Sequence, residues 1–141
     1  MKKAIALLLA LVMVFALCAC GGGDKGTADN GEKVVKIGVF EPASGDSGAG
    51  GKKEMLGMQY ANQETPTVEI GGETYKVELV YSDNGSDSAK AVSAASKLVN
   101  EKVSIVLGSY GSGVSIAASD TFKQAGIPAI GVTCTNPNVT A

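Results

Sequence analysis

Short apolar runs alternate along this chain with segments whose apolar residues recur at helical spacing. We expect strands over residues 34–40, 67–70, 73–81, 103–107 and 127–132, and helices over residues 52–63, 88–100 and 112–125. Alternation of this kind is typical of a parallel sheet with helices on both faces. The predicted fold class is therefore α/β, a Rossmann-like sheet flanked by helices.

Turn and capping residues support these boundaries. Gly71 and Gly72 form a two-residue connection between β-prone runs, which indicates a hairpin. Ser86 or Asp87 is suited to cap the helix that follows. Gly126 is suited to end the last helix, since glycine readily adopts the left-handed conformation of a helix C-terminus.

The N-terminus has the pattern of an export signal. Lys2 and Lys3 precede an uncharged apolar run, residues 4–19, which ends in Leu-Cys-Ala-Cys-Gly and resembles a lipobox. We expect residues 1–19 to be a lipoprotein signal peptide, cleaved before Cys20, which then carries the lipid. Residues 20–33 are Gly-rich and polar and are expected to be a flexible tether. The alternative is an uncleaved membrane anchor, for which the apolar run is short.

Composition excludes several functions. The mature chain would keep ten Lys and fourteen acidic residues, a formal charge of −4, which argues against a nucleic-acid partner. The chain has no His, the usual general base and the commonest zinc ligand, so we expect no enzyme, no metal and no cofactor. Cys134 is left without a cysteine partner and is expected to be a buried structural thiol.

The ligand edge of such a sheet lies at the carboxyl ends of its strands. Residues 41–51, 82–86, 109–112 and 133–137 are predicted to form the loops there. The Gly-rich segment 45–53 follows a strand and opens a helix, as phosphate-binding loops do, but its spacing matches neither the P-loop nor the dinucleotide pattern. Nucleotide binding is therefore the weaker alternative, and a plain solvent-facing loop is another.

Two of these loops carry candidate binding residues. Tyr110, Gly111 and Ser112 join a strand to a helix start, whose free N–H groups favour an anion such as a carboxylate. The alternative is that Ser112 only caps its helix. Thr133 and Thr135 offer a carbonyl and a hydroxyl that suit an ammonium group.

The segment 34–141 resembles the branched-chain amino-acid family of extracytoplasmic solute-binding proteins, which have the type I periplasmic-binding-protein fold and serve ABC importers. The matching stretches are VKIGVFEPASG (35–45), VELVYSD (77–83) leading to Ala91 and Val92, VLGS (106–109), GIPAI (126–130) and TNP (135–137).

The resemblance implies a two-lobed clamp that closes on a small solute, of which residues 34–141 would be the incomplete first lobe. It also implies that the Ser112 loop binds the ligand carboxylate and that Thr133 and Thr135 bind its ammonium. Several family members place an aromatic residue near the position of Gly50, where this chain has only small residues.

The function expected from these observations is capture of an amino acid or similar polar solute for an ABC permease. The protein would be held on the extracytoplasmic face of the cell membrane by the lipid on Cys20. A sensory ligand-binding domain of the same fold is one alternative, and a nucleotide-binding enzyme is the other.

Overall fold

The computed structural model describes residues 31–141, of which Glu32–Ala141 form one folded unit. The expected signal peptide, the lipidation site Cys20 and most of the expected tether lie outside the described residues. No helix among residues 31–141 is long and apolar enough to cross a membrane.

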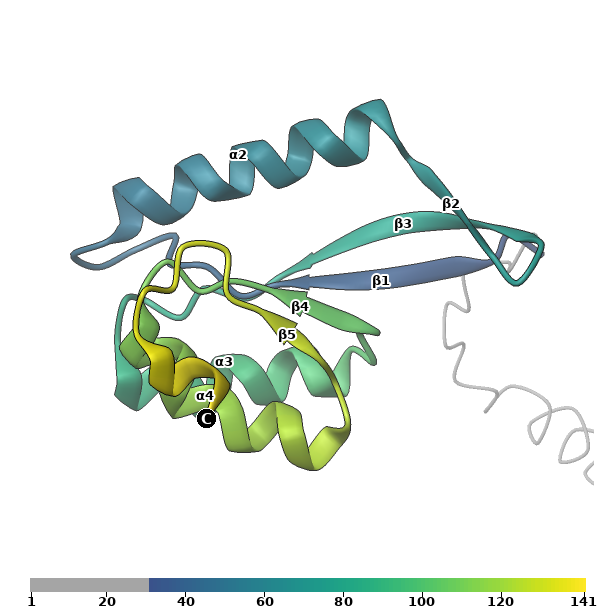
Figure 1. Cartoon of the computed structure of the whole chain (residues 1–141). Helices are drawn as coiled ribbons and strands as arrows, with labels where there is room; N and C mark the ends of the chain where they lie inside the picture. Colours follow the sequence, from purple (N-terminus) through teal and green to yellow (C-terminus); the bar gives the residue numbers. More distant parts are fainter. Residues whose placement is uncertain (1–30) are drawn as a thin grey trace, which may run out of the picture. The chain divides into compact units, whose positions relative to one another are not determined.

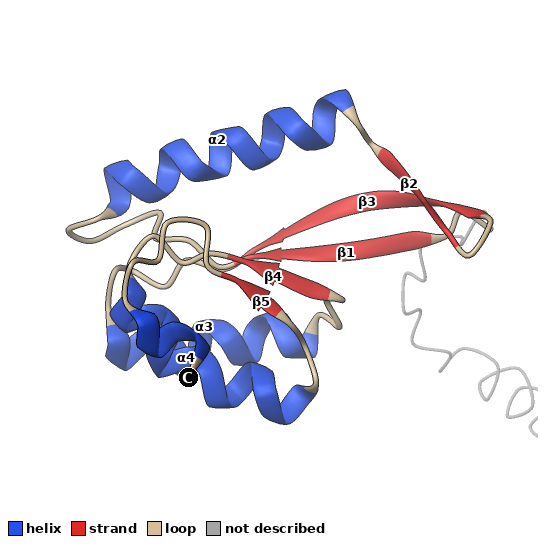
Figure 2. Ribbon diagram, viewed as in Figure 1, coloured by secondary structure: helices blue, strands red, loops and turns tan. Residues whose placement is uncertain are grey.

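A five-stranded sheet in the order β2-β3-β1-β4-β5 forms the centre of this unit (Figure 2). Its strands are β1 (Val34–Val39), β2 (Thr67–Ile70), β3 (Glu73–Tyr81), β4 (Ile105–Leu107) and β5 (Ala129–Ile130). β1 pairs in parallel with both β3 and β4, and β4 pairs in parallel with β5. β2 runs antiparallel to β3, as the Gly-Gly hairpin predicted.

Helices cover both faces of the sheet (Figure 1). α3 (Ser88–Asn100) and α4 (Ser112–Ala125) lie side by side on one face, and α2 (Gly48–Glu64) lies over the other. The predicted caps are confirmed: the Asp87 carboxylate accepts from the N–H of Ala89 at 2.8 Å, and Gly126 ends α4 with φ of 68°. A short 3₁₀ helix, η1 (Pro137–Thr140), follows β5.

The hydrophobic core lies between the sheet and the pair α3 and α4. Leu98 and Val106 are completely buried there, and the rings of Phe40 and Phe122 meet edge to face with centroids 5.5 Å apart. Alanines complete the contact between the two helices: Ala91, Ala94 and Ala95 of α3, and Ala118 of α4. These small side chains let the helix backbones approach closely.

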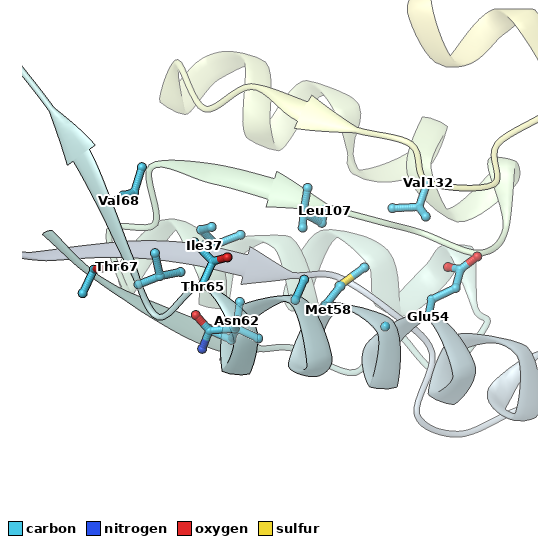
Figure 3. Close-up of a pocket in the computed structure, with 13 residues that line it drawn as sticks. Ile37, Glu54, Met58, Asn62, Thr65, Thr67, Val68, Leu107 and Val132 are labelled. Atoms are coloured by element: carbon cyan, nitrogen blue, oxygen red, sulfur yellow. The ribbon is translucent and has the colours of Figure 1, made fainter.

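The opposite face of the sheet is covered only loosely. The buried residues of α2 are two glycines, Gly48 and Gly51, and its apolar side chains border a groove of about 620 Å³ instead of a filled core (Figure 3). Met58 lines the groove from the helix, and Ile37 and Leu107 line it from the sheet. The predicted apolar face of this helix, Met55, Met58 and Ala61, is therefore only partly buried or exposed.

The predicted bounds of three elements were wrong. α2 begins at Gly48, four residues before the predicted start. Position 51 requires glycine, because Gly51 lies so close to Pro42 that a side chain there would collide with it. Glycines that discourage a helix locally are here required by tertiary contact. β4 begins two residues late, at Ile105, and β5 is confined to Ala129–Ile130 because its pairing with β4 involves only those residues.

Leu98→Ala should lower the free energy of unfolding by about 2–5 kcal/mol, because a completely buried side chain leaves a cavity when it is truncated. Val92→Ala is the matched control on the same helix, since Val92 is 50% exposed, and it should change stability by no more than about 0.5 kcal/mol. Urea denaturation of the two variants measures the difference. Equal losses of stability in the two variants would contradict the placement of the core between the sheet and α3.

Candidate functional site

The carboxyl ends of the parallel strands bring the predicted loops to one edge of the sheet. β1 lies between β3 and β4, so the chain crosses to one side of β1 first and then to the other. Ligands of open α/β sheets bind at such a reversal of strand order. The loops that follow β1, β3, β4 and β5 meet there.

Ser112 does not cap its helix. The N-cap of α4 is Gly111, and no side chain makes a capping hydrogen bond. The Ser112 hydroxyl oxygen instead accepts hydrogen bonds from the backbone N–H groups of Thr135, at 3.1 Å, and Asn136, at 3.3 Å. A hydroxyl has two acceptor lone pairs and one proton, so the proton of Ser112 is what remains to donate.

The other predicted residues of these two loops also come together. The Thr133 hydroxyl donates to the carbonyl of Tyr110 at 3.4 Å. The Cys134 thiol donates to the carbonyl of Ser109 at 3.3 Å and lies 3.3 Å from the Ser115 hydroxyl. Cys134 therefore joins the two loops, and it is half-buried, less than we expected.

The loop after β1 is held by Asp83, at the end of β3. The Asp83 carboxylate accepts from the N–H groups of Ala43 and Gly85, both at 2.8 Å, and from the Ser44 hydroxyl at 2.7 Å. Burial alone would raise the pKa of Asp83. The hydrogen bonds from Ser44, Gly85 and Ala43 outweigh it and hold that pKa below its ordinary value.

Asn84 connects this loop to the one after β4. Its side chain is fully buried, and its amide N–H groups donate to the Phe40 carbonyl at 3.1 Å and to the Ser109 hydroxyl at 3.0 Å. A buried amide with its donors satisfied fixes the spacing of the groups it joins. Sequence reasoning did not find Asn84, because asparagine in a polar loop is usually a turn residue.

An aromatic ring covers Gly50, although no aromatic residue is near it in the sequence. A Cβ atom at position 50 would lie 2.6 Å from two ring atoms of Tyr110. Tyr110 comes from the loop after β4 and is 43% exposed at the edge. The glycine in the first turn of α2 thus makes the space that the ring occupies.

Glu41 is the other residue that sequence reasoning missed. It directly follows the buried Phe40, is 1% exposed, and accepts from the backbone N–H of Tyr110 at 2.7 Å. Burial, and then the neighbouring Glu54 carboxyl group, raise the pKa of Glu41 to about 8. The available signal was an acidic residue placed immediately after an apolar strand.

The geometry can hold a small polar molecule by backbone N–H groups and hydroxyls. Among residues 31–141, no group of three or more His, Cys, Asp or Glu side chains is arranged to hold a metal ion.

Comparison with known proteins identifies the family. The family model described as "Periplasmic binding protein" matches residues 34–141. A Leu/Ile/Val-binding protein homolog of Brucella abortus is 34% identical over 129 residues, which cover 92% of this chain and 33% of the relative. The chain therefore spans about a third of the length of that curated relative.

Two solved structures share the fold. The leucine binding protein of Thermotoga maritima is 36% identical with a TM-score of 0.69, over 76% of this chain and 30% of that one. A branched-chain amino acid transporter substrate-binding protein of Streptococcus pneumoniae, solved in complex with isoleucine, is 34% identical with a TM-score of 0.67, over 77% of this chain and 31% of that one.

This chain belongs to the periplasmic binding protein family, with the type I fold of the branched-chain amino-acid group. The resemblance noted from residues 34–141 and the predicted α/β class are thereby confirmed. The match covers part of the length of each relative, as the incomplete first lobe predicted.

Gly50→Ala should displace the Tyr110 ring from the edge, because the new methyl group needs the space that the ring occupies. Gly57→Ala is the control on the same helix: nothing lies within 4 Å of a Cβ there, so it should only add helix propensity, about 1 kcal/mol of stability. The measurement is the NMR chemical shifts of the Tyr110 ring. An unmoved ring in Gly50→Ala would contradict the packing described.

Proposed function

We propose that this protein captures a small solute with a carboxylate and an ammonium group, of the branched-chain amino-acid type, and delivers it to an ABC permease. The observation that carries the proposal is the joining of two loops through Ser112, whose hydroxyl proton is left to donate beside the start of α4.

The carboxylate half of the site would lie at Gly111 and Ser112. The first N–H groups of a helix point outward and lie at the positive end of its dipole, so they attract an anion. Gly111 has no side chain to obstruct the approach, and the Ser112 hydroxyl adds a donor. A carboxylate held by several N–H and O–H donors needs no positively charged side chain.

The ammonium half would lie at Thr133 and Thr135. Both residues are exposed at the same edge. The hydrogen bond from the Thr135 backbone N–H to the Ser112 hydroxyl would keep them close to the carboxylate half. A carbonyl and a hydroxyl oxygen are the acceptors that an ammonium group requires. Tyr110 would lie alongside the solute, because it is exposed between the two loops and the first turn of α2.

The names of the relatives support the same ligand class. The Brucella relative is named for leucine, isoleucine and valine, and the Streptococcus structure holds isoleucine. These solutes share the carboxylate and the ammonium for which the two loops offer partners. The role is binding and release without chemistry on the solute, so we propose no enzymatic activity.

We also propose that Cys20 carries a lipid which holds the mature protein at the extracytoplasmic face of the cell membrane. The support is the sequence alone: a basic start, an apolar run and a small residue before the cysteine. Anchoring would keep the binding domain close to the permease that it serves.

Leucine, isoleucine and valine should raise the thermal unfolding temperature of the full-length protein, since a ligand that binds only the folded state stabilises it by about 2.7 kcal/mol at a hundred times Kd. Benzoate, which has a carboxylate and no ammonium, should stabilise it much less. The absence of a shift with every amino acid of the panel would count against the proposal.

Ser112→Ala should weaken binding of the best amino acid by about 10- to 150-fold, the loss of a hydrogen bond to a charged group of about 1.5–3 kcal/mol. Ser119→Ala removes a hydroxyl from the exposed side of the same helix and should leave affinity unchanged. Isothermal titration calorimetry measures both. If Ser112→Ala bound the amino acid as tightly as Ser119→Ala, Ser112 would not be a ligand-binding residue.

Cys20→Ser should abolish lipidation of the N-terminus, because serine has no thiol to form the thioether link. Cys134→Ser is the control that keeps Cys20. Fractionation of cells expressing each variant, with mass spectrometry of the N-terminal peptide, gives the result. An uncleaved N-terminus with an unmodified Cys20 in the native protein would instead support the membrane-anchor alternative.

A further inference from the structure

A buried carboxyl group lies directly behind the loop that carries Tyr110 and Ser112. Glu41 Oε2 accepts from the N–H of Tyr110 at 2.7 Å, while Glu41 Oε1 has no hydrogen-bond partner. Gly108 lies against that unpartnered oxygen, since a Cβ there would approach it to 2.5 Å. The carboxyl group is thus enclosed by the loop whose backbone it holds.

Glu54 approaches Glu41 from α2. Glu54 is half-buried, neither of its carboxyl oxygens has a hydrogen-bond partner, and it lies one turn beyond Gly50, against which the Tyr110 ring rests. Figure 3 shows its side chain projecting away from the helix at one end of the apolar groove. The two carboxyl groups are neighbours, and neither has a proton to donate to the other while both are ionised.

One shared proton would give two of these three unpartnered oxygens a partner. Two ionised carboxylates in contact and out of water repel each other, and such pairs respond by retaining a proton. The protonated member becomes a donor, so the bond between the two groups satisfies an oxygen on each. Burial, with the neighbouring Glu54, raises the pKa of Glu41 to about 8, so the pair would hold its proton at neutral pH.

We propose that Glu41 and Glu54 share one proton and that the pair is a positioning device, which holds the Tyr110–Ser112 loop and the start of α2 in the geometry that binds the solute. Glu41 acts through the Tyr110 N–H and touches no solute itself. This inference rests on the proposed function, and it adds a pH-dependent control to it.

Among the titratable groups near Glu41, Glu54 is the one whose charge acts on it. In the loop after β3, Asp83 has its carboxylate engaged by the loop after β1, and Asn84 is uncharged. Lys52 and Lys53 of α2 are exposed to solvent. The loop after β4 contributes the Tyr110 N–H.

The direction of the pH effect follows from the raised pKa. A carboxyl whose pKa is higher in the folded protein than its ordinary 4.5 favours the folded arrangement most at low pH, and the advantage is lost as pH rises through about 8. Above that pH the pair would carry two negative charges, which separate α2 from the loop. Solute affinity should therefore fall at alkaline pH.

The first experiment reads the pair without any solute. In full-length protein labelled with ¹⁵N, the backbone amide shift of Tyr110 should titrate with a midpoint near the pKa of about 8. In Glu41→Gln the step near pH 8 should be absent, because the Gln side chain carries no titratable proton. A Tyr110 amide that does not titrate in the native protein, or that titrates equally in Glu41→Gln, would overturn the proposal.

The second experiment measures affinity for leucine from pH 6.5 to pH 9.5 by calorimetry. Native affinity should fall by up to about tenfold for each pH unit above the pH at which the pair loses its shared proton. Glu41→Gln, whose amide can replace the protonated carboxyl, should bind at pH 6.5 like the native protein and keep that affinity at alkaline pH. Glu41→Ala should bind weakly throughout.

Glu64→Gln is the control, because it removes the same charge from the exposed far end of α2 and should retain the native pH profile. Equal profiles for the native protein and Glu41→Gln would overturn the inference while the proposed function stands. If no solute binds at any pH, the proposed function fails. The Tyr110 titration then still decides whether the pair exists.

Discussion

The packing of α3 and α4 on one face of the sheet is the interaction on which the rest depends. Phe40 belongs to that core and immediately precedes Glu41, so the core fixes where the loop after β1 begins. α4 contributes Phe122 to the core at one end and Ser112 to the edge at the other. Burial of apolar side chains far from the edge thus sets the positions of the polar groups at it.

The sheet and the α3–α4 layer were predictable because their local and tertiary preferences agree. Asp87 caps α3, Gly126 ends α4, and the Gly-Gly turn joins two β-prone runs, each as its own sequence requires. The start of α2 was not predictable, since three glycines between Gly48 and Gly51 discourage a helix in isolation. Their role appears only when the backbone of Pro42 lies against Gly51.

The candidate site likewise has residues that could be placed from the sequence and contacts that could not. Ser112, Thr133 and Thr135 could be placed at one edge from strand order alone, because parallel strands direct their carboxyl ends alike. The contacts of Glu41 and Asn84 with the loop after β4 could not, because they join segments that are 69 and 25 residues apart along the chain. Local sequence patterns carry no information about which distant groups will share an enclosed space.

The contact between Gly50 and Tyr110 bears on how such sites are compared across a family. The ring at this edge comes from the loop after β4, and it occupies the space beside Gly50 in the first turn of α2. A position-by-position comparison of the loop after β1 alone would find only small residues here, although the Tyr110 ring lies against Gly50. Comparison by occupied volume, with both loops considered together, would include the ring and would treat Gly50 and Tyr110 as one packing unit.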